Sequence, residues 1–153
     1  MIDERILGVA TDGGTSVLVG SADANAVPAC CRGIAVSTDG ALARATVYVP
    51  AATSRDVIAN AATTKKLSVM ITRVVEHVGV QLKGTVEAIR MAGDDEAPFV
   101  RRRLNEFADV LDAIGLPRRI FRSVSHWPAF AVELKVEEVY DQTPGPRAGS
   151  CIR

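Results

Sequence analysis

The chain of 153 residues is 48% hydrophobic and 24% charged, which is typical of one compact globular domain. Its 18 Lys and Arg residues balance 18 Asp and Glu residues, so no net positive charge is available to hold DNA or RNA non-specifically. No apolar run approaches the ~18 residues of a membrane span, and the chain opens on Asp3, Glu4 and Arg5 rather than on a signal-like basic stretch. We therefore expect a cytoplasmic protein that binds neither nucleic acid nor a membrane.

Its 3 cysteines, Cys30, Cys31 and Cys151, are an odd number in a chain long enough to bury a core without disulfides. In a strand, Cys30 and Cys31 would point to opposite faces, which disfavours a shared metal ion or a mutual bridge. We interpret these two as core or wall residues, with a redox pair as the alternative. His77 and His126 add no zinc-ligand spacing, and neither stands in a recognisable catalytic setting.

The first part of the chain predicts a short helix followed by strands. The helix covers Asp3 to Ala10 and stops before a pair of glycines. Ser16 to Val19 and Ala26 to Ser37 are β-branched or apolar stretches around a turn-prone segment, which indicates a hairpin. The Asp39-Gly40 turn then leads into Leu42 to Val49, whose alternation places apolar side chains on one face of a strand.

A second helix and two more strands follow. Thr53, with Asp56 three residues later, forms a capping signature that predicts a helix through about Ala62. Residues 67–72 and 80–88 each alternate between apolar and polar side chains, which predicts two half-buried strands.

The last part of the chain predicts one long helix and one long strand. From Val100 to Ile114, apolar residues recur at three- and four-residue spacings, which predicts a helix. A Gly and a Pro then end it. The arginines at 101–103 begin the face of this helix that we expect to be solvated. Phe130 to Tyr140 reads as the final strand. Residues 143–153 form an extended C-terminal tail that we expect to lie over the surface of a single domain, residues 1–153.

Six mostly antiparallel strands with an inserted helix lack the βα alternation of a doubly wound sheet. The predicted fold is mainly β (α+β), a six-stranded antiparallel split β-barrel with flanking helices. Closure also removes the exposed edges of so apolar a sheet. The alternative is an open sheet covered by helices on one face.

Two groups of residues are candidates for ligand binding. Thr53, Ser54 and Arg55 bring hydroxyls, a guanidinium and free backbone N–H groups to a helix N-terminus, which suits a phosphate; an ordinary helix cap is the alternative. Gln81 and Lys83 share a strand face and could bind carbonyl or phosphate oxygens.

Arg32, like Gln81 and Lys83, lies in a stretch otherwise rich in small and apolar residues. Plain solvent exposure on a half-buried strand is the alternative for these three side chains. Because no catalytic triad or metal motif is present, an enzyme built on this chain would rely on a cofactor for its chemistry.

Several strings resemble the FMN-binding split-barrel superfamily, which includes pyridoxamine 5'-phosphate oxidase. They are SVLVGSADANAVPACCRG, the Asp39-Gly40 turn, TVYVP running into TSRDVIAN, and VQLKG, while FAVELKVEEVYDQTPGPRAG resembles the ending of short, little-characterised members. The resemblance implies a homodimer with FMN in each of two clefts between subunits. It further implies that Thr53, Ser54 and Arg55 hold the phosphate, and that Arg32, Gln81 and Lys83 lie near the isoalloxazine ring.

Two departures from this family limit what can be expected of the substrate and of the affinity for FMN. The basic, histidine-containing C-terminal pattern that recognises pyridoxamine phosphate is replaced by Thr143-Pro144-Gly145-Pro146, and the junction before Thr53 is Pro50-Ala51-Ala52, which has no basic side chain. The leading hypothesis is an FMN-binding oxidoreductase, a flavoprotein acting on a small-molecule redox substrate. The alternatives are a non-catalytic module that binds FMN, haem or another planar ligand, and a cofactor-free structural dimer.

Overall fold

The computed structural model describes residue 2 and residues 4–153. The elements, in chain order, are α1 (Glu4–Thr11), β1 (Ser16–Ala22), β2 (Pro28–Gly33), β3 (Ala35–Thr38), β4 (Arg44–Pro50), α2 (Arg55–Thr64), β5 (Lys66–Arg73), β6 (Val78–Met91), α3 (Ala97–Ala113), the 3-10 helix η1 (Arg118–Ser123), β7 (Ala129–Asp141) and β8 (Ser150–Cys151). None of these helices has the length and apolar content needed to cross a membrane.

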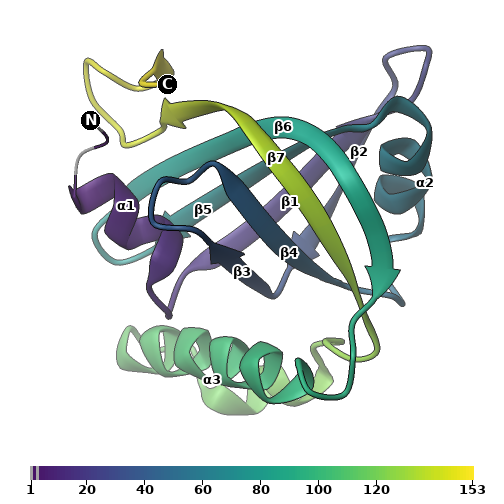
Figure 1. Ribbon diagram of the computed structural model, residues 1–153. Coiled ribbons are helices and arrows are strands. Elements are labelled where there is room, and N and C mark those ends of the chain that lie inside the picture. The colour runs from purple at the N-terminus through teal and green to yellow at the C-terminus, as the bar shows by residue number, and fades with distance from the viewer. Residues whose placement is uncertain (1, 3) are drawn as a thin grey trace.

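The strands form one antiparallel sheet that curls on itself (Figure 1). Its order is β2-β1-β5-β6-β7-β4-β3, and β8 pairs with β7. β2 and β3 follow each other in the chain with only Ile34 between them, yet they lie at opposite ends of this order. The Ile34 N–H donates to the Tyr48 carbonyl on β4 at 2.9 Å. The chain therefore joins the two ends of the sheet, and the predicted split barrel is confirmed. The described residues form eight strands rather than the six predicted, because one predicted strand is divided into β2 and β3 and the tail adds β8.

The predicted strand from Ala26 to Ser37 is divided in the structure. Its first two residues belong to the hairpin turn, because the Asp23 carboxylate accepts hydrogen bonds from the N–H groups of Asn25 and Val27 at 2.8 and 2.9 Å. The remainder forms β2 and β3, which bend apart at Ile34 to pair with different neighbours. One continuous stretch of the sequence therefore supplies the strands at both ends of the sheet order.

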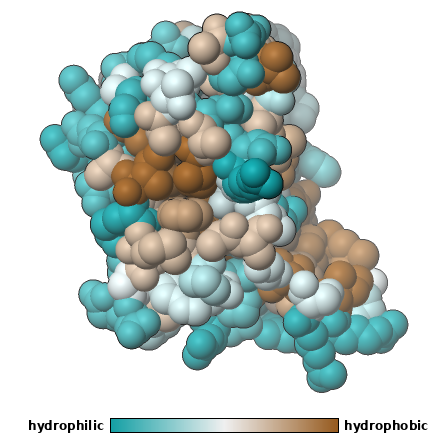
Figure 2. All heavy atoms as spheres, turned by 90° about the vertical axis from the view of Figure 1, so that its right-hand side faces the viewer, coloured by the Kyte–Doolittle hydropathy of each residue, from teal (hydrophilic) through white to brown (hydrophobic). Residues whose placement is uncertain are grey.

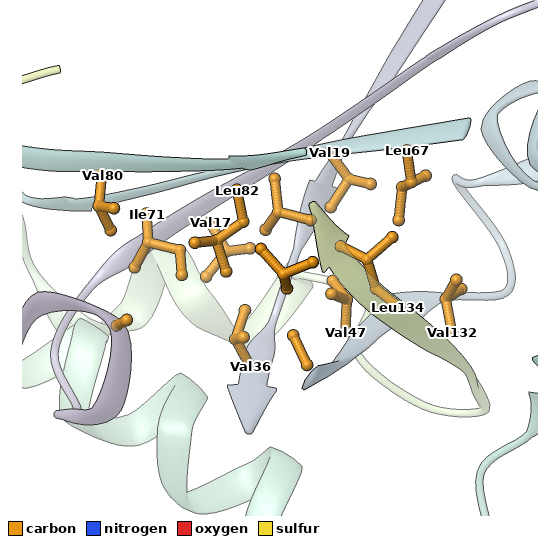
Figure 3. Packing of buried hydrophobic residues seen from close by; sticks show 14 of the residues in the cluster. Val17, Val19, Val36, Val47, Leu67, Ile71, Val80, Leu82, Val132 and Leu134 are labelled. Carbon is orange, nitrogen blue, oxygen red and sulfur yellow. The ribbon is translucent and has the colours of Figure 1, made fainter. Parts of the chain in front are cut away.

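Branched aliphatic side chains fill the barrel interior. Figure 3 shows them pointing toward one another from opposite walls: Val17, Val19, Leu67, Ile71, Val80 and Leu82 on one side and Val36, Val47, Val132 and Leu134 on the other. In β4, β5, β6 and β7 these buried residues are members of the alternating patterns that the sequence predicts. Each such side chain contributes about 1.5 to 3 kcal/mol when fully buried.

A second apolar cluster lies between the barrel and α3, and it buries residues on the outward face of β4. Tyr48 is 6% exposed and packs with Val100 and Leu104 of α3, while its ring meets that of Phe99 edge-on at 5.7 Å. The predicted solvated face of α3 is corrected at Arg103, which is half-buried and donates to the Thr11 carbonyl at 2.7 Å. The helix therefore holds the barrel with both apolar and polar contacts.

One hydrogen-bond network fixes the start of α3 to β4 and β6. The Tyr48 hydroxyl donates to the Glu96 carboxylate at 2.7 Å, and the Arg90 guanidinium donates to both Glu96 oxygens at 2.6 and 2.9 Å. The hydrogen bonds from Arg90, with those from the Gly93 N–H and the Tyr48 hydroxyl, lower the pKa of Glu96 to about 2.

We expect acid to weaken this network before it unfolds the barrel. Because the folded pKa of Glu96 is depressed, its stabilisation is full above the unfolded value of 4.5 and is lost as the pH falls toward about 2. The loss should be on the order of 1 kcal/mol, since the side chain is partly solvated. Urea unfolding from pH 6 to 3 measures it, and Glu96→Gln should remove that pH dependence.

Tyr48→Phe should lower the free energy of unfolding by about 1.5 kcal/mol at neutral pH, the lower range for a hydrogen bond to a charged group. Tyr140→Phe is the matched control, because the Tyr140 hydroxyl also donates to a carboxylate, that of Glu138 at 2.9 Å, but at an exposed position. An equal effect of the two changes would contradict the role given to the Tyr48–Glu96 bond.

Candidate functional site

A groove of about 690 Å³ opens on the outer face of the sheet. It is lined by Gly20, Ser21 and Ala22 of β1, Pro28, Ala29 and Cys30 of β2, Lys66, Leu67 and Ser68 of β5, Lys83 and Gly84 of β6, and Glu137 and Glu138 of β7. This volume falls within the range of sites for small organic ligands. The groove spans neighbouring strands of one wall of the barrel.

Strand register explains why these residues meet. Gly20 pairs with Ser68, Ser68 with Lys83, and Lys83 with Glu138, so a single row crosses from β1 to β7 on the outer face. The row supplies both donors and acceptors to the groove. The ammonium of Lys83 lies 4.6 Å from the centre of the Tyr140 ring, and it makes no ion pair among the residues described.

A β-bulge at Glu137 brings two carboxylates to the same face. Lys83 pairs with Glu138 and Gly84 with Val136, so Glu137 is an extra residue on β7. Both glutamates therefore face outward, and the alternation changes phase, which buries Val139 and Asp141. Simple alternation would have placed Glu138 inward. Glu137 accepts hydrogen bonds from the Lys66 ammonium at 3.0 Å and from Thr85 at 2.8 Å.

Small residues form the groove floor, and apolar ones border it. A Cβ at Gly20 would meet only the Ala29 carbonyl oxygen, at 3.8 Å, so the surface above Gly20 is open. Next along the outer face, Leu18 pairs with Met70; Leu18 is 49% exposed and Met70 is half-buried. An apolar pair of side chains therefore lies next to the charged groove.

Gln81 lies on the same face, one row away from Lys83, but its amide is already engaged. It donates to the Ser68 hydroxyl at 2.8 Å and accepts from the Gln142 amide at 2.9 Å. The structure thus brings Gln81 and Lys83 together, as predicted. Of the two, only Lys83 lines the groove. Gln81 lies outside the lining and holds the Ser68 hydroxyl, which is part of it.

Arg32 lies at the far end of this face, on edge strand β2. Its guanidinium sits 4.8 Å from the centre of the Phe107 ring of α3, a cation–π contact. Partial burial lowers the pKa of Arg32, although the residue as a whole counts as exposed. Arg32 does not line the groove, and it is two positions along β2 from Cys30, which does.

The third predicted group lies at the start of α2, and its capping differs from the prediction. Ser54, not Thr53, is the N-cap, and no side-chain hydrogen bond caps the helix, so the predicted capping box of Thr53 and Asp56 does not form. The Ser54 hydroxyl is fully buried without a hydrogen-bond partner. Thr53 and Arg55 are exposed beside it.

The helix start is connected to the groove wall but does not line it. The Ser21 hydroxyl donates to the Val57 carbonyl, in the first turn of α2, at 3.0 Å. Within one chain, the predicted residues therefore form three separate groups: Gln81 with Lys83, Arg32, and 53–55. Sequence reasoning missed Lys66 and Ser68, although they occupy the polar positions of β5, and it missed the bulge-dependent Glu138.

The cysteines separate as predicted: Cys31 is buried and Cys30 is exposed in the groove. Burial, with the neighbouring Cys30, raises the pKa of Cys31 to about 11, so its thiol stays protonated at neutral pH. His77 is exposed in a turn, and His126 Nδ1 lies 3.2 Å from the Val124 carbonyl oxygen. Within the described residues, no group of 3 or more His, Cys, Asp and Glu side chains could hold a metal ion.

Comparison with known proteins identifies the fold. No family model and no curated protein matches the chain. Among solved structures, HupZ from Group A Streptococcus is 14% identical with a TM-score of 0.56, over 97% of this chain and 100% of that one. A candidate pyridoxamine 5'-phosphate oxidase from Lactobacillus delbrueckii is 14% identical with a TM-score of 0.56, over 91% and 93%.

An FMN-binding protein from Syntrophomonas wolfei is 13% identical with a TM-score of 0.53, over 89% of this chain and 82% of that one. At such identities the similarity concerns the arrangement of the backbone alone. The chain therefore has the split-barrel fold of pyridoxamine 5'-phosphate oxidase-like and FMN-binding proteins.

Proposed function

We propose that this protein is an FMN-binding oxidoreductase that acts as a homodimer, with the outer-face groove holding the flavin ring. The observation that supports this most is the groove itself, which has small residues on its floor and Lys83 in its lining. Fold neighbours described as FMN-binding or as a pyridoxamine 5'-phosphate oxidase make a flavin the first ligand to test.

The groove residues suit a planar ring with carbonyl oxygens. Gly20, Ala22 and Ala29 leave the surface free of bulky side chains, so a flat ligand can approach the strands closely. Lys83 can donate charge-assisted hydrogen bonds to carbonyl oxygens. The Lys66 ammonium is hydrogen-bonded to Glu137, so Lys66 would form part of the groove wall rather than bind the flavin directly.

The start of α2 suits a phosphate. Its first backbone N–H groups have no side-chain cap, and the positive end of a helix dipole favours an anion. The hydrogen-bonding capacity of the Ser54 hydroxyl is unused, and the exposed Thr53 and Arg55 stand next to it.

A second subunit would bring the separate groups to one ligand. Arg32, the α2 start and Lys83 do not line one groove in a single chain, so two copies meeting on this face would complete the site. The exposed Leu18 beside Met70 supports burial of the face. Hydrophobic side chains also gather among polar ones on the side of the molecule that carries α2 (Figure 2).

When bound, FMN would supply the electron transfer. The chain's own contribution is to orient the ring through Lys83, to anchor the phosphate at residues 53–55, and to exclude water with the apolar border of the groove. Gln81 is a positioning residue, because it acts through Ser68.

Lys83→Met should weaken FMN binding about tenfold or more, since a hydrogen bond to a charged group contributes about 1.5 to 3 kcal/mol. Arg55→Ala should have an effect of about 1 to 3 kcal/mol for the same reason. Lys135→Met is the control, because Lys135 is exposed on β7 outside the groove. Quenching of flavin fluorescence measures all three affinities; unchanged binding in Lys83→Met would remove Lys83 from the site.

The function is tested by the visible absorption spectrum of the purified protein, fresh and after incubation with FMN and desalting. Retained flavin bands, followed by turnover of a reduced nicotinamide with an electron acceptor, are the expected results. Retained flavin without turnover would favour a non-catalytic binding module. A spectrum without flavin would overturn the proposal in favour of another planar ligand or a cofactor-free dimer.

A further inference from the structure

A second cavity, which shares no lining residue with the outer-face groove, lies between α3 and η1. It measures about 500 Å³ and is lined by Arg101, Arg118, Arg119, Arg122, Phe121 and His126, with Leu104, Asn105 and Ala108 of α3. The two helices pack side by side below the barrel (Figure 1). Among the residues that the structure describes, no Asp or Glu contributes to its lining, although the chain as a whole has equal numbers of acidic and basic residues.

Most of the guanidinium groups around this cavity have no acidic partner in the part of the chain that the structure describes. Arg101, Arg119 and Arg122 make no side-chain hydrogen bond or ion pair with the residues described, whereas Arg118 pairs with Asp109. Elsewhere in the molecule arginines are usually paired, as in the contact of Arg44 with Glu87 at 3.0 Å. Three unpaired guanidiniums at one concave surface form a strong receptor for phosphate oxygens.

The cavity also has an apolar wall. Leu104 and Ala108 are buried beneath it, and the half-buried Phe121 ring meets Phe107 edge-on at 5.7 Å, which fixes its orientation. A fixed ring beside buried aliphatic groups offers a surface for a flat apolar group. The cavity therefore combines sites for negative charge with a place for a ring.

We propose that this cavity binds a nucleotide, that is, a phosphorylated ligand whose phosphates contact Arg101, Arg119 and Arg122 and whose ring packs near Phe121. The cavity volume is within the range of sites for ligands of this size. The inference does not rest on flavin binding in the outer-face groove, so either site can fail without the other.

An anionic membrane surface is the competing occupant. Ile114, Leu116 and Ile120 are exposed near the same helix ends, and exposed apolar side chains with arginines are typical of peripheral membrane contacts. The site is concave, however, and its arginines surround a cavity that a flat bilayer would leave unfilled. The nucleotide is therefore favoured, and the experiment separates the two.

Isothermal titration calorimetry of the full chain at low ionic strength should show one ATP bound per subunit, more tightly than inorganic pyrophosphate, which lacks the ring. The single variant Arg101→Gln should weaken ATP binding about tenfold or more. The double variant Arg119→Gln/Arg122→Gln should do the same. Added salt should also weaken ATP binding by the parent protein. Urea unfolding of each variant checks that the fold is retained.

Arg102→Gln provides the matched control, because Arg102 is an exposed neighbour of Arg101 on α3 and lies outside the cavity lining. Its ATP affinity should stay within about twofold of the parent. Equal losses in Arg101→Gln and Arg102→Gln would indicate non-specific attraction and overturn the proposal. Equal affinity for pyrophosphate and ATP, or binding to phosphatidylglycerol vesicles without ATP binding, would overturn it as well.

Discussion

Gly84→Ala should destabilise the barrel by about 3 kcal/mol, at the upper end of the usual cost of overpacking. A Cβ at Gly84 would lie 1.9 Å from the Lys135 carbonyl oxygen and 3.0 Å from the Val136 Cα. Both contacts are with backbone, which cannot rotate away as a side chain would. The glycine permits the close approach of β6 and β7 at the bulge that turns Glu137 and Glu138 outward. Urea unfolding at neutral pH measures the loss.

Gly20→Ala is the control for this prediction. Gly20 also lies in a strand, but an added Cβ would make only an ordinary contact, 3.8 Å from the Ala29 carbonyl oxygen. Its stability should equal or slightly exceed that of the parent, because replacing a strand glycine reduces the freedom of the unfolded chain. Similar unfolding curves for the two alanine variants would contradict the packing account of Gly84.

Gly20→Leu should weaken FMN binding strongly while leaving the barrel folded. The side chain at this position projects into the groove, where Gly20 lies in the same row as Ser68 and Lys83. A leucine would occupy the floor that the flavin ring is proposed to cover, and forced overpacking of about 1 to 3 kcal/mol corresponds to roughly 5- to 150-fold weaker binding. Flavin fluorescence titration measures the affinity.

Gly40→Leu is a suitable comparison, because nothing lies within 4 Å of a Cβ at Gly40 and the residue is in a turn outside the groove. It should bind FMN as the parent does. Undiminished flavin binding in Gly20→Leu, with the fold intact by circular dichroism, would place the ligand elsewhere on the molecule.

Sequence periodicity predicts most of this fold, because the barrel is built on alternation. The inward residues of β1, β5 and β6 all follow a period of two, and they form one of the two facing walls of the core in Figure 3. The pattern fails where the backbone departs from regular pairing. Ile34 divides one apolar stretch between two ends of the sheet, and the bulge at Glu137 shifts the phase of β7. Both features depend on partner strands far away in the chain.

The candidate site is harder to predict because it depends on lateral register. Gln81 and Lys83 stand out in the sequence as polar residues of one strand face, but Lys83 lines the groove and Gln81 does not. Lys66 and Glu138 line the same groove although they are 72 residues apart in the sequence. The η1 helix and its unpaired arginines were likewise not predicted, since a short 3-10 turn has no distinctive periodicity.

The central claim is that two subunits hold FMN at the outer face of the sheet. Sedimentation velocity of the FMN-incubated protein, recorded at the visible flavin absorption, tests ligand and assembly together. The account predicts flavin absorbance moving with a dimer of the 16.2 kDa chain, at one FMN per subunit. Flavin absorbance that remains with free ligand, or that moves with a monomer, would contradict it.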